Sequence, residues 1–287
     1  MTIPNITVLM PVHGEAPYLE QAIDSVLSQT CAEFELLIVF DRPEQKTLAT
    51  VEKFRSNDKR IRSIHSTTQG ISAALNLGLA HTNTLLVARL DCDDVMERER
   101  LEKQESILRD ERIVCVGSQL RIMDENGGTL RYTHYPTKHF EIESSLRIRN
   151  VVAHPSVMFK KSAVNLAGGY RSEFNGSEDY DLWIRLSRIG RIVNMNRPFT
   201  NYRLHQNQAS ARNKEIQTQL DAKVRKNNYT KLRHKPGLAS ALLINKAINV
   251  SGVTRIGLMT LAVIKSPSTV IKFLVWQYIP EVFSNDK

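Results

Sequence analysis

Three acidic side chains fall within four residues in the segment Asp91-Cys92-Asp93-Asp94, directly after the apolar run 84–90. Carboxylates packed this closely repel one another unless a cation neutralises them. Oxygen ligands of this kind are how Mg²⁺ or Mn²⁺ is held beside a diphosphate. The alternative is a solvated turn that caps the next helix, since acidic N-caps are common. Because the segment ends a predicted buried strand, we favour a metal site.

Two further acidic positions could take part in chemistry. Asp41 ends the apolar run 34–40, where an acid can accept a hydrogen bond from a base or a ribose. Its alternative is an Asx-turn before Pro43. Glu178-Asp179 opens the predicted helix 178–189, whose dipole should keep a carboxylate ionised and able to accept a proton from a hydroxyl. Here the alternative is plain capping of the first turn.

The elements that position these acids follow a regular alternation. Apolar runs rich in β-branched residues predict strands, and helical spacing predicts the segments between them. Strands alternating with helices indicate a parallel sheet covered on both faces, with ligands outside the carboxyl ends of the strands. The predicted strands are 6–12, 34–40, 61–65 and 84–90, and the predicted helices are 18–27, 45–55 and 71–79.

The pattern changes after about residue 112. Asn126-Gly127-Gly128 lies between two strand-like runs and predicts a hairpin. A polar helix near 139–149, a strand at 156–160 and the helix 178–189 follow, so we expect an α+β half packed against or continuing the first sheet. From about 213 the chain is basic and helical, with amphipathic stretches at 253–265 and 268–279.

Composition restricts the class of protein. The 287 residues include 39 Lys and Arg against 30 Asp and Glu, a net charge of +9 that attracts polyanions. The basic third has few interleaved aromatics, which argues against nucleic-acid binding. An odd number of cysteines without a CxxC pair fits a reducing compartment. With no leader pattern and no run of 18 apolar residues, we expect a cytoplasmic protein or one peripheral on the inner face of a membrane.

Several familiar site motifs are absent from the sequence. There is no GxGxxG after the first strand, no GxxxxGK[ST] and no HExxH, so dinucleotide, P-loop and zinc-protease interpretations lack their motifs. His154 and His205 are each more often structural than functional on residue type alone.

Taken in order, these blocks resemble glycosyltransferase family 2, whose members share the GT-A fold. The resemblance covers roughly residues 5–210. The blocks that carry it are ITVLMPVHGE at 6–15, LEQAIDSVLSQT at 19–30, the strand 34–41, GISAALNLG at 70–78, LDCDD at 90–94, HPSVMF at 154–159, GGY at 168–170, SEDYDLWIRL at 177–186 and YRLH at 202–205.

The resemblance implies an α/β fold of GT-A type: a Rossmann-like, mostly parallel sheet with an α+β acceptor half and a helical C-terminal extension. The corresponding boundaries are 1–111 for the nucleotide-sugar part, 112–212 for the acceptor part and 213–287 for the extension. The implied activity is metal-dependent, inverting transfer of a sugar from a nucleoside diphosphate sugar, with UDP-sugar favoured, to a glycan or glycolipid acceptor. We expect a place in bacterial surface polysaccharide or lipopolysaccharide synthesis.

The resemblance also implies roles for individual residues. Asp179 is the expected general base, with Glu178 beside it, and His154 and Trp183 are expected on the acceptor side. The expected nucleotide-binding residues are Pro11, His13, Glu15, Asp41, Gly70, Asn76, Asp91 and Cys92. The expected ligands of Mn²⁺ or Mg²⁺ are Asp91, Asp93, Asp94 and His205.

Two departures from the family pattern bear on specificity. Members often have D-D-G-S after the second strand, whereas this chain has Phe40-Asp41-Arg42-Pro43, so the rim of the nucleotide pocket differs. The Q-x-x-R-W motif of processive synthases is absent, and we expect one sugar added per encounter.

Three questions stay open at this point. The extension 213–287 could bind an anionic membrane or simply cap the core. The rival functions are another nucleotide-sugar enzyme, such as a nucleotidyltransferase, and a non-catalytic protein that binds a nucleotide sugar or a polyanion.

Overall fold

Four parallel strands form the first half of the sheet; three of them are buried apolar runs, and the edge strand 61–65 is partly exposed. The computed structural model describes residues 5–206, 208 and 214–229. The strand order is β3-β2-β1-β4, and all three pairings are parallel, as predicted. These strands are β1 (Ile6–Gly14), β2 (Phe34–Pro43), β3 (Ile61–His65) and β4 (Leu86–Arg89), and they are linked by α1 (Leu19–Leu27), α2 (Gln45–Asn57) and α3 (Ile71–His81).

The second half continues the same sheet across the boundary near residue 112. β8 pairs antiparallel with β4 and with β6, and β6 pairs in parallel with β9 over ten residue positions. The sheet therefore runs β3-β2-β1-β4-β8-β6-β9-β5, with β7 beside β6. The added strands are β5 (Val95–Met96), β6 (Ile113–Met123), β7 (Thr129–Tyr132), β8 (Met158–Lys160) and β9 (Arg191–Arg203).

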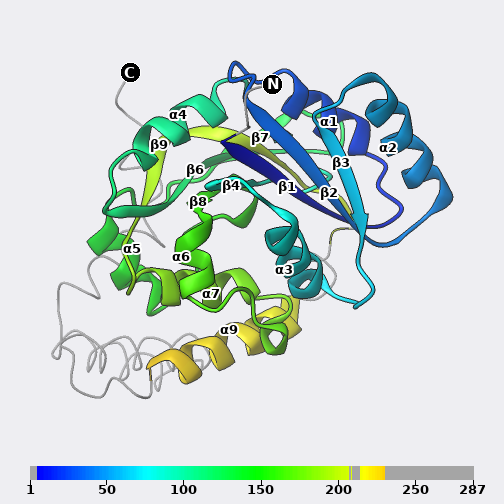
Figure 1. The fold of residues 1–287 in the computed structure, drawn as a ribbon. Helices are drawn as coiled ribbons and strands as arrows, with labels where there is room; N and C mark the ends of the chain where they lie inside the picture. The colour runs from blue at the N-terminus through cyan, green and yellow to red at the C-terminus, as the bar shows by residue number, and fades with distance from the viewer. Residues whose placement is uncertain (1–4, 207, 209–213, 230–287) are drawn as a thin grey trace, which may run out of the picture.

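Helices cover both faces of this sheet, and each face has its own apolar core (Figure 1). On one face Ile23, Val51 and Leu101 pack from α1, α2 and α4 against the inner strands. On the other face the core is built from α3 and from four later helices. The helices of the second half are α4 (Arg100–Leu108), α5 (His139–Leu146), α6 (Lys161–Leu166) and α7 (Glu178–Leu186), with short 3₁₀ turns η1 (His154–Ser156) and η2 (Ser172–Phe174).

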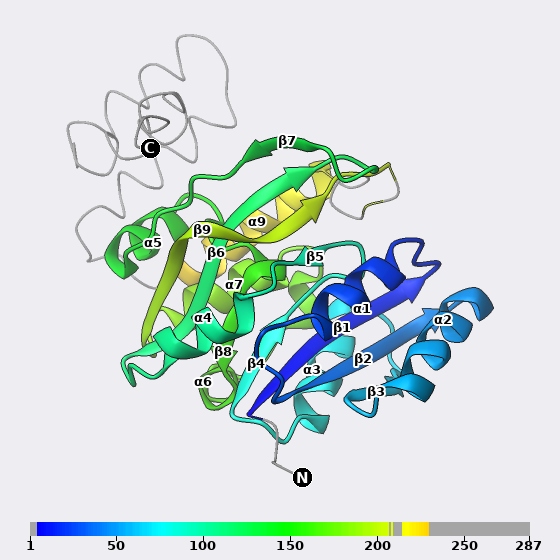
Figure 2. The same ribbon diagram turned by 90° about the horizontal axis from the view of Figure 1, so that it is seen from above.

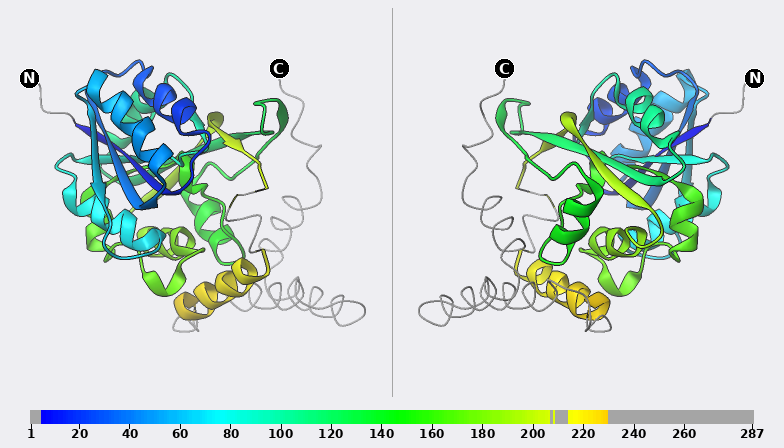
Figure 3. Two further views of the ribbon diagram at one scale, coloured as in Figure 1. Left: turned by 90° about the vertical axis from the view of Figure 1, so that its right-hand side faces the viewer. Right: turned by 90° about the vertical axis from the view of Figure 1, so that its left-hand side faces the viewer.

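The last described helix, α9 (Lys214–Tyr229), lies against α7 on the side away from the sheet (Figures 1 and 3). The Ser177 hydroxyl donates to Asp221 at 2.6 Å, and Asn228 donates to Asp181 at 2.9 Å. Val224 is fully buried in the core under the helices. The beginning of the predicted C-terminal extension therefore caps α7. The amphipathic stretches 253–265 and 268–279, and with them the membrane interpretation, lie outside the described residues.

Within the described part of the chain, no helix is both long enough and apolar enough to cross a bilayer.

The sequence analysis missed β9, a 13-residue strand that runs alongside β6 (Figure 2). Its apolar residues do not alternate cleanly, and Pro198 interrupts it where the register with β6 shifts. Proline removes a ladder donor and is tolerated in a sheet at such irregularities. The strand is fixed by its long pairing with β6, which leaves little trace in local sequence.

Candidate functional site

Two of the predicted site regions, Asp41 and the segment 91–94, lie where parallel strands of the first half end. Asp41 is near the carboxyl end of β2 and lies in register with His13 of β1. Asp91 follows β4, which pairs with β1 on its other side. Because β2, β1 and β4 are parallel neighbours, their carboxyl ends form one edge of the sheet. The strand topology therefore puts Asp41 and the segment 91–94 at the same edge.

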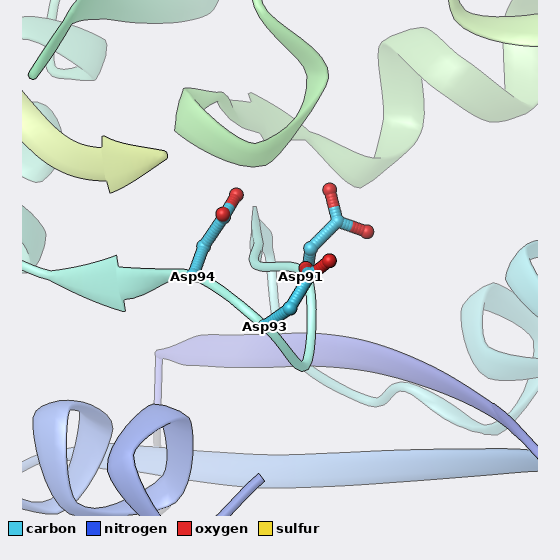
Figure 4. A group of neighbouring side chains, drawn as sticks. All are labelled: Asp91, Asp93 and Asp94. Atoms are coloured by element: carbon cyan, nitrogen blue, oxygen red, sulfur yellow. The ribbon is translucent and has the colours of Figure 1, made fainter. Parts of the chain in front are cut away.

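The segment 91–94, called the acid loop from here on, brings three carboxylates together (Figure 4). One oxygen from each of Asp91, Asp93 and Asp94 lies within 4.8 Å of the others. Asp94 is fully buried: its Oδ1 accepts the backbone N–H of Arg203 at 2.9 Å, and its Oδ2 has no hydrogen-bond partner. Burial, followed by the charge of neighbouring acids, raises the pKa of Asp93 and raises that of Asp94 well above its usual range. The acid loop therefore gathers three carboxylates and leaves one buried carboxylate oxygen, Asp94 Oδ2, without a hydrogen-bond donor.

This set fits a hard divalent cation. Mg²⁺ and Mn²⁺ take oxygen ligands, and a cation would supply the partner that the buried Asp94 Oδ2 lacks. His205, expected as a further ligand, places its Nε2 2.9 Å from Asp93 Oδ2. It also packs against the Tyr18 ring. The side chain is therefore beside the acid loop, bonded to one of its carboxylates.

Arg203 holds the acid loop from behind, and the sequence analysis gave it no role. Its side chain is 2% exposed, and it donates through Nε to the Asp93 carbonyl oxygen at 3.0 Å. The remaining nitrogens donate to the Glu125 carbonyl at 2.8 Å and to Gln21 Oε1 at 2.6 Å. With its backbone N–H on Asp94, this single residue ties the loop to α1 and to the β6–β7 hairpin.

Arg89, the last residue of β4, is a second buried cation that the sequence analysis missed. It is 3% exposed and forms an ion pair with Asp91, while its Nε has no hydrogen-bond partner. Burial raises the pKa of Glu178, and the charge of Arg89 is a smaller contribution that lowers it, so the guanidinium lies near enough to act on Glu178 as well as on Asp91. A signal for it existed: a charged residue inside an otherwise apolar predicted strand.

Glu178 and Asp179 open α7, and their carboxylates have different neighbours. Glu178 is 6% exposed and accepts the Gly176 N–H at 2.6 Å. Asp179 accepts the Asn150 side-chain N–H at 2.8 Å and its neighbour's backbone N–H, from Tyr180, at 2.7 Å. Burial, followed by the charge of Glu178, raises the pKa of Asp179 to about 7. The expectation that the helix dipole dominates is wrong, because desolvation outweighs it.

The two residues expected on the acceptor side are both buried. Trp183 has no exposed surface, and its indole N–H donates to the Val152 carbonyl at 3.1 Å. A fully buried ring cannot contact an acceptor, so the expected acceptor-side role of Trp183 is wrong. Trp183 instead supports His154, because the two rings pack edge to face. His154 lies 3.0 Å from the Tyr170 hydroxyl and 3.9 Å from Glu178. Burial and then Arg89 hold the pKa of His154 well below its usual value, so its ring is neutral.

Several residues predicted to contact the nucleotide gather around Asp41. Its Oδ2 accepts the Gly70 N–H at 3.0 Å and faces His13 Nδ1 at 3.3 Å. Gly70 precedes α3 with a φ of 105°, a backbone conformation that favours glycine. His13 and Glu15 are exposed at this rim, with side chains 61% and 53% accessible.

Three other residues expected at the nucleotide have different surroundings. Asn76 uses both polar side-chain atoms to hydrogen-bond the backbone of Tyr170. Its Nδ2 donates to the carbonyl oxygen at 2.7 Å and its Oδ1 accepts the N–H at 2.9 Å, which holds α3 against the turn before η2. Pro11 is buried inside β1, and the Cys92 side chain packs on the apolar core. Burial raises the pKa of the Cys92 thiol well above its usual value. The contacts of Asn76, Pro11 and Cys92 therefore support a role in holding neighbouring segments in place.

The model of the family described as Glycosyl transferase family 2 matches residues 7–165. The O-antigen biosynthesis glycosyltransferase WbnJ of Escherichia coli is 35% identical over 204 residues, which cover 70% of this chain and 80% of WbnJ. Chondroitin synthase of Pasteurella multocida is 27% identical over 216 residues, or 75% of this chain, but the chain spans only 22% of that enzyme.

Two solved structures share the fold. S. aureus TarS 1–349 in complex with UDP-GlcNAc has a TM-score of 0.64 at 15% identity, covering 93% of this chain and 82% of that one. The mannosyltransferase PcManGT of Pyrobaculum calidifontis, in complex with GDP-Man and Mn²⁺, has a TM-score of 0.58 at 18% identity, covering 98% and 89%. The fold is the GT-A type expected from the sequence.

Proposed function

Since this chain belongs to glycosyl transferase family 2, we propose that it moves a sugar, with inversion, from a nucleoside diphosphate sugar to a hydroxyl of a glycan or lipid-linked glycan. The observation that carries the proposal is the meeting of two acid groups around one buried cation. Arg89 pairs with Asp91 of the acid loop, and its charge acts on Glu178 at the start of α7. The proposed diphosphate site and the proposed proton acceptor therefore both border Arg89.

Asp179 is the proposed general base. Its pKa of about 7 leaves a substantial ionised fraction at neutral pH, and the donors Asn150 and Tyr180 fix the direction of its carboxylate. The carboxylate would take the proton of the acceptor hydroxyl while that oxygen bonds to the anomeric carbon. The bond to the nucleoside diphosphate breaks on the opposite face, which inverts the configuration. Glu178, beside His154, would shape the floor under the sugar.

Asp91, Asp93 and Asp94 are the proposed ligands of Mn²⁺ or Mg²⁺, with His205 at the edge of the set. When bound, the ion would neutralise charge on the departing diphosphate. Arg203 and Arg89 position the ligand oxygens before any ion arrives. Such preorganisation matters because electrostatic stabilisation is strongest when groups need not reorganise during the reaction.

A uridine donor and a bacterial surface glycan are the proposed substrates. Support for the donor comes from TarS, crystallised with UDP-GlcNAc, although the related fold of PcManGT holds GDP-Man. Support for the acceptor class comes from WbnJ, named for O-antigen biosynthesis, and from AmsE of Erwinia amylovora, named for amylovoran biosynthesis and 32% identical over 177 residues. Because the chain spans about a fifth of chondroitin synthase, polymerisation is not part of the proposal.

The test is a transfer assay on the full chain. Purified protein, Mn²⁺, a panel of UDP- and GDP-sugars and lipid-linked glycan acceptors should give a product whose new linkage, read by NMR, has the anomeric configuration opposite to that of the donor. EDTA should stop transfer, and added Mn²⁺ should restore it. A product that retains the donor's configuration would overturn the single-displacement mechanism, and undiminished transfer after EDTA treatment would remove the metal role.

A further inference from the structure

The bulge at the end of β2 places a charged side chain that the family pattern does not lead one to expect. His13 pairs with Asp41 and Gly14 pairs with Pro43, so Arg42 is an extra residue without a partner on β1. Its φ is 52°, and among the described residues it is the only non-glycine with a positive φ. A left-handed conformation at a non-glycine residue is unfavourable, and such residues gather at functional sites.

The bulge changes the direction of the Arg42 side chain. Successive side chains on a regular strand point to opposite faces, so neighbours do not normally meet. Here Arg42 Nε lies 3.5 Å from Asp41 Oδ1. The other carboxylate oxygen, Oδ2, is already taken by Gly70 and faces His13. The guanidinium is therefore beside the one Asp41 oxygen that remains open to a ligand.

The pair presents a hydrogen-bond acceptor beside a donor. Asp41 is the inner member, with 10% of its side chain exposed, and Arg42 is the outer member at 59%. An ionised carboxylate only accepts and a guanidinium only donates. Uracil offers the matching edge, a ring N–H next to a carbonyl oxygen. Cytosine in the same place would set a ring nitrogen lone pair against the carboxylate and an amino group against the guanidinium.

We infer that Arg42 is a specificity residue for the donor base, selecting uracil over cytosine by donating to the base carbonyl while Asp41 accepts the ring N–H. This inference rests on the proposed function, because it assumes that the Asp41 rim binds the nucleobase. It adds a residue at the position where family members often carry glycine. Arg42 rests on the carboxylate that the base would use.

The experiment compares two pyrimidine diphosphates of equal size. Isothermal titration calorimetry with Mn²⁺ should show that wild-type protein binds UDP more tightly than CDP. In Arg42→Gly and Arg42→Ala the UDP affinity should fall about tenfold, the usual order for a hydrogen bond to a charged group, while the CDP affinity changes less than threefold. Arg112→Ala is the matched control, an exposed arginine paired with Asp110 at 2.8 Å just before the amino end of β6, away from the carboxyl ends of β1, β2 and β4.

The two Arg42 variants separate side chain from backbone. Glycine accepts the positive φ, so Arg42→Gly should melt at the wild-type temperature or above it, which verifies folding. If the ratio of UDP affinity to CDP affinity is unchanged in both variants, including the case where both affinities fall equally, the inference about Arg42 is wrong while the proposed function still stands. A wild-type protein that binds no nucleoside diphosphate in the presence of Mn²⁺ would overturn the proposed function with it.

Discussion

The acid loop and the start of α7 are both clusters of neighbouring carboxylates, yet their surroundings differ. In the acid loop, the buried Asp94 Oδ2 has no donor, and the loop relies on Arg203 and Arg89 for its shape. At α7, Glu178 and Asp179 each accept a backbone N–H, and Asp179 also accepts from Asn150. Burial raises carboxyl pKa values in both places.

The difference shows how one residue type can serve two purposes. A cluster that leaves a buried carboxylate oxygen without a donor can be completed by a cation, which supplies positive charge. A cluster whose oxygens are directed by donors can instead exchange a proton, provided that its pKa lies near the working pH. The proposed roles are cation binding for the acid loop and proton transfer for α7, and each proposal can be tested separately.

The largest effect is expected from Asp179→Asn. Loss of a positioned general base lowers turnover roughly 10²–10⁴-fold, while UDP binding in the presence of Mn²⁺ should stay within a few-fold of wild type. Single-turnover kinetics and calorimetry measure the two quantities. Asp110→Asn, at an acid far from the site, is the control. Equal loss of binding and turnover would mean that α7 also holds the nucleotide, and the division of labour would fail.

A smaller effect is expected from Arg203→Met, which keeps the length of the side chain and removes its donors. Without them the acid loop loses its ties to α1 and the β6–β7 hairpin. Loss of a residue that orients metal ligands lowers metal affinity roughly 10–100-fold. A Mn²⁺ titration of turnover should therefore shift to higher concentration and recover at saturation. Arg112→Met controls for the loss of an arginine; a normal titration would show that the loop needs no clamp.

The last prediction concerns pH, where the effect near neutrality is small and grows with acidity. Since the pKa of Asp179 is raised to about 7 and a base acts in its ionised form, turnover should fall as pH drops below about 7. The expected slope is tenfold per pH unit, with a plateau above pH 8. Turnover at saturating donor and Mn²⁺ across pH 5–9 gives the profile. A flat profile down to pH 5 would show that the donor or the ion lowers this pKa, or that another group accepts the proton.

Much of the donor half could be predicted from sequence. β1, β2 and β4 are mostly apolar runs, the pattern that a parallel sheet buried on both faces requires, while β3 at the edge is mixed. The acid loop and Asp41 were identifiable because polar residues end these runs abruptly. The helix beginning at Glu178 was also predicted, since acids fill its first turn and one side of it is apolar.

The remaining features depend on contacts between distant segments. Asn76, predicted to bind the nucleotide, hydrogen-bonds the backbone of Tyr170, 94 residues away. Helical spacing alone could not assign Trp183 to the core. In the sequence Arg89 is a single charged residue in an apolar strand, and its ion pair with Asp91 is apparent only in the structure. Local periodicity contains no information about such partners.

The bond from the Arg203 N–H to Asp94 joins residues 109 positions apart, and it affects the order in which the protein assembles. During synthesis, a nascent chain that has emerged only through α7 already carries every acid of the site. It still lacks β9, the strand that seats Asp94. Contacts of such long sequence separation form late because loop closure must precede them. If the acid loop binds Mn²⁺ as proposed, we expect tight binding only in the finished domain, and fragments ending before residue 203 should bind the ion weakly.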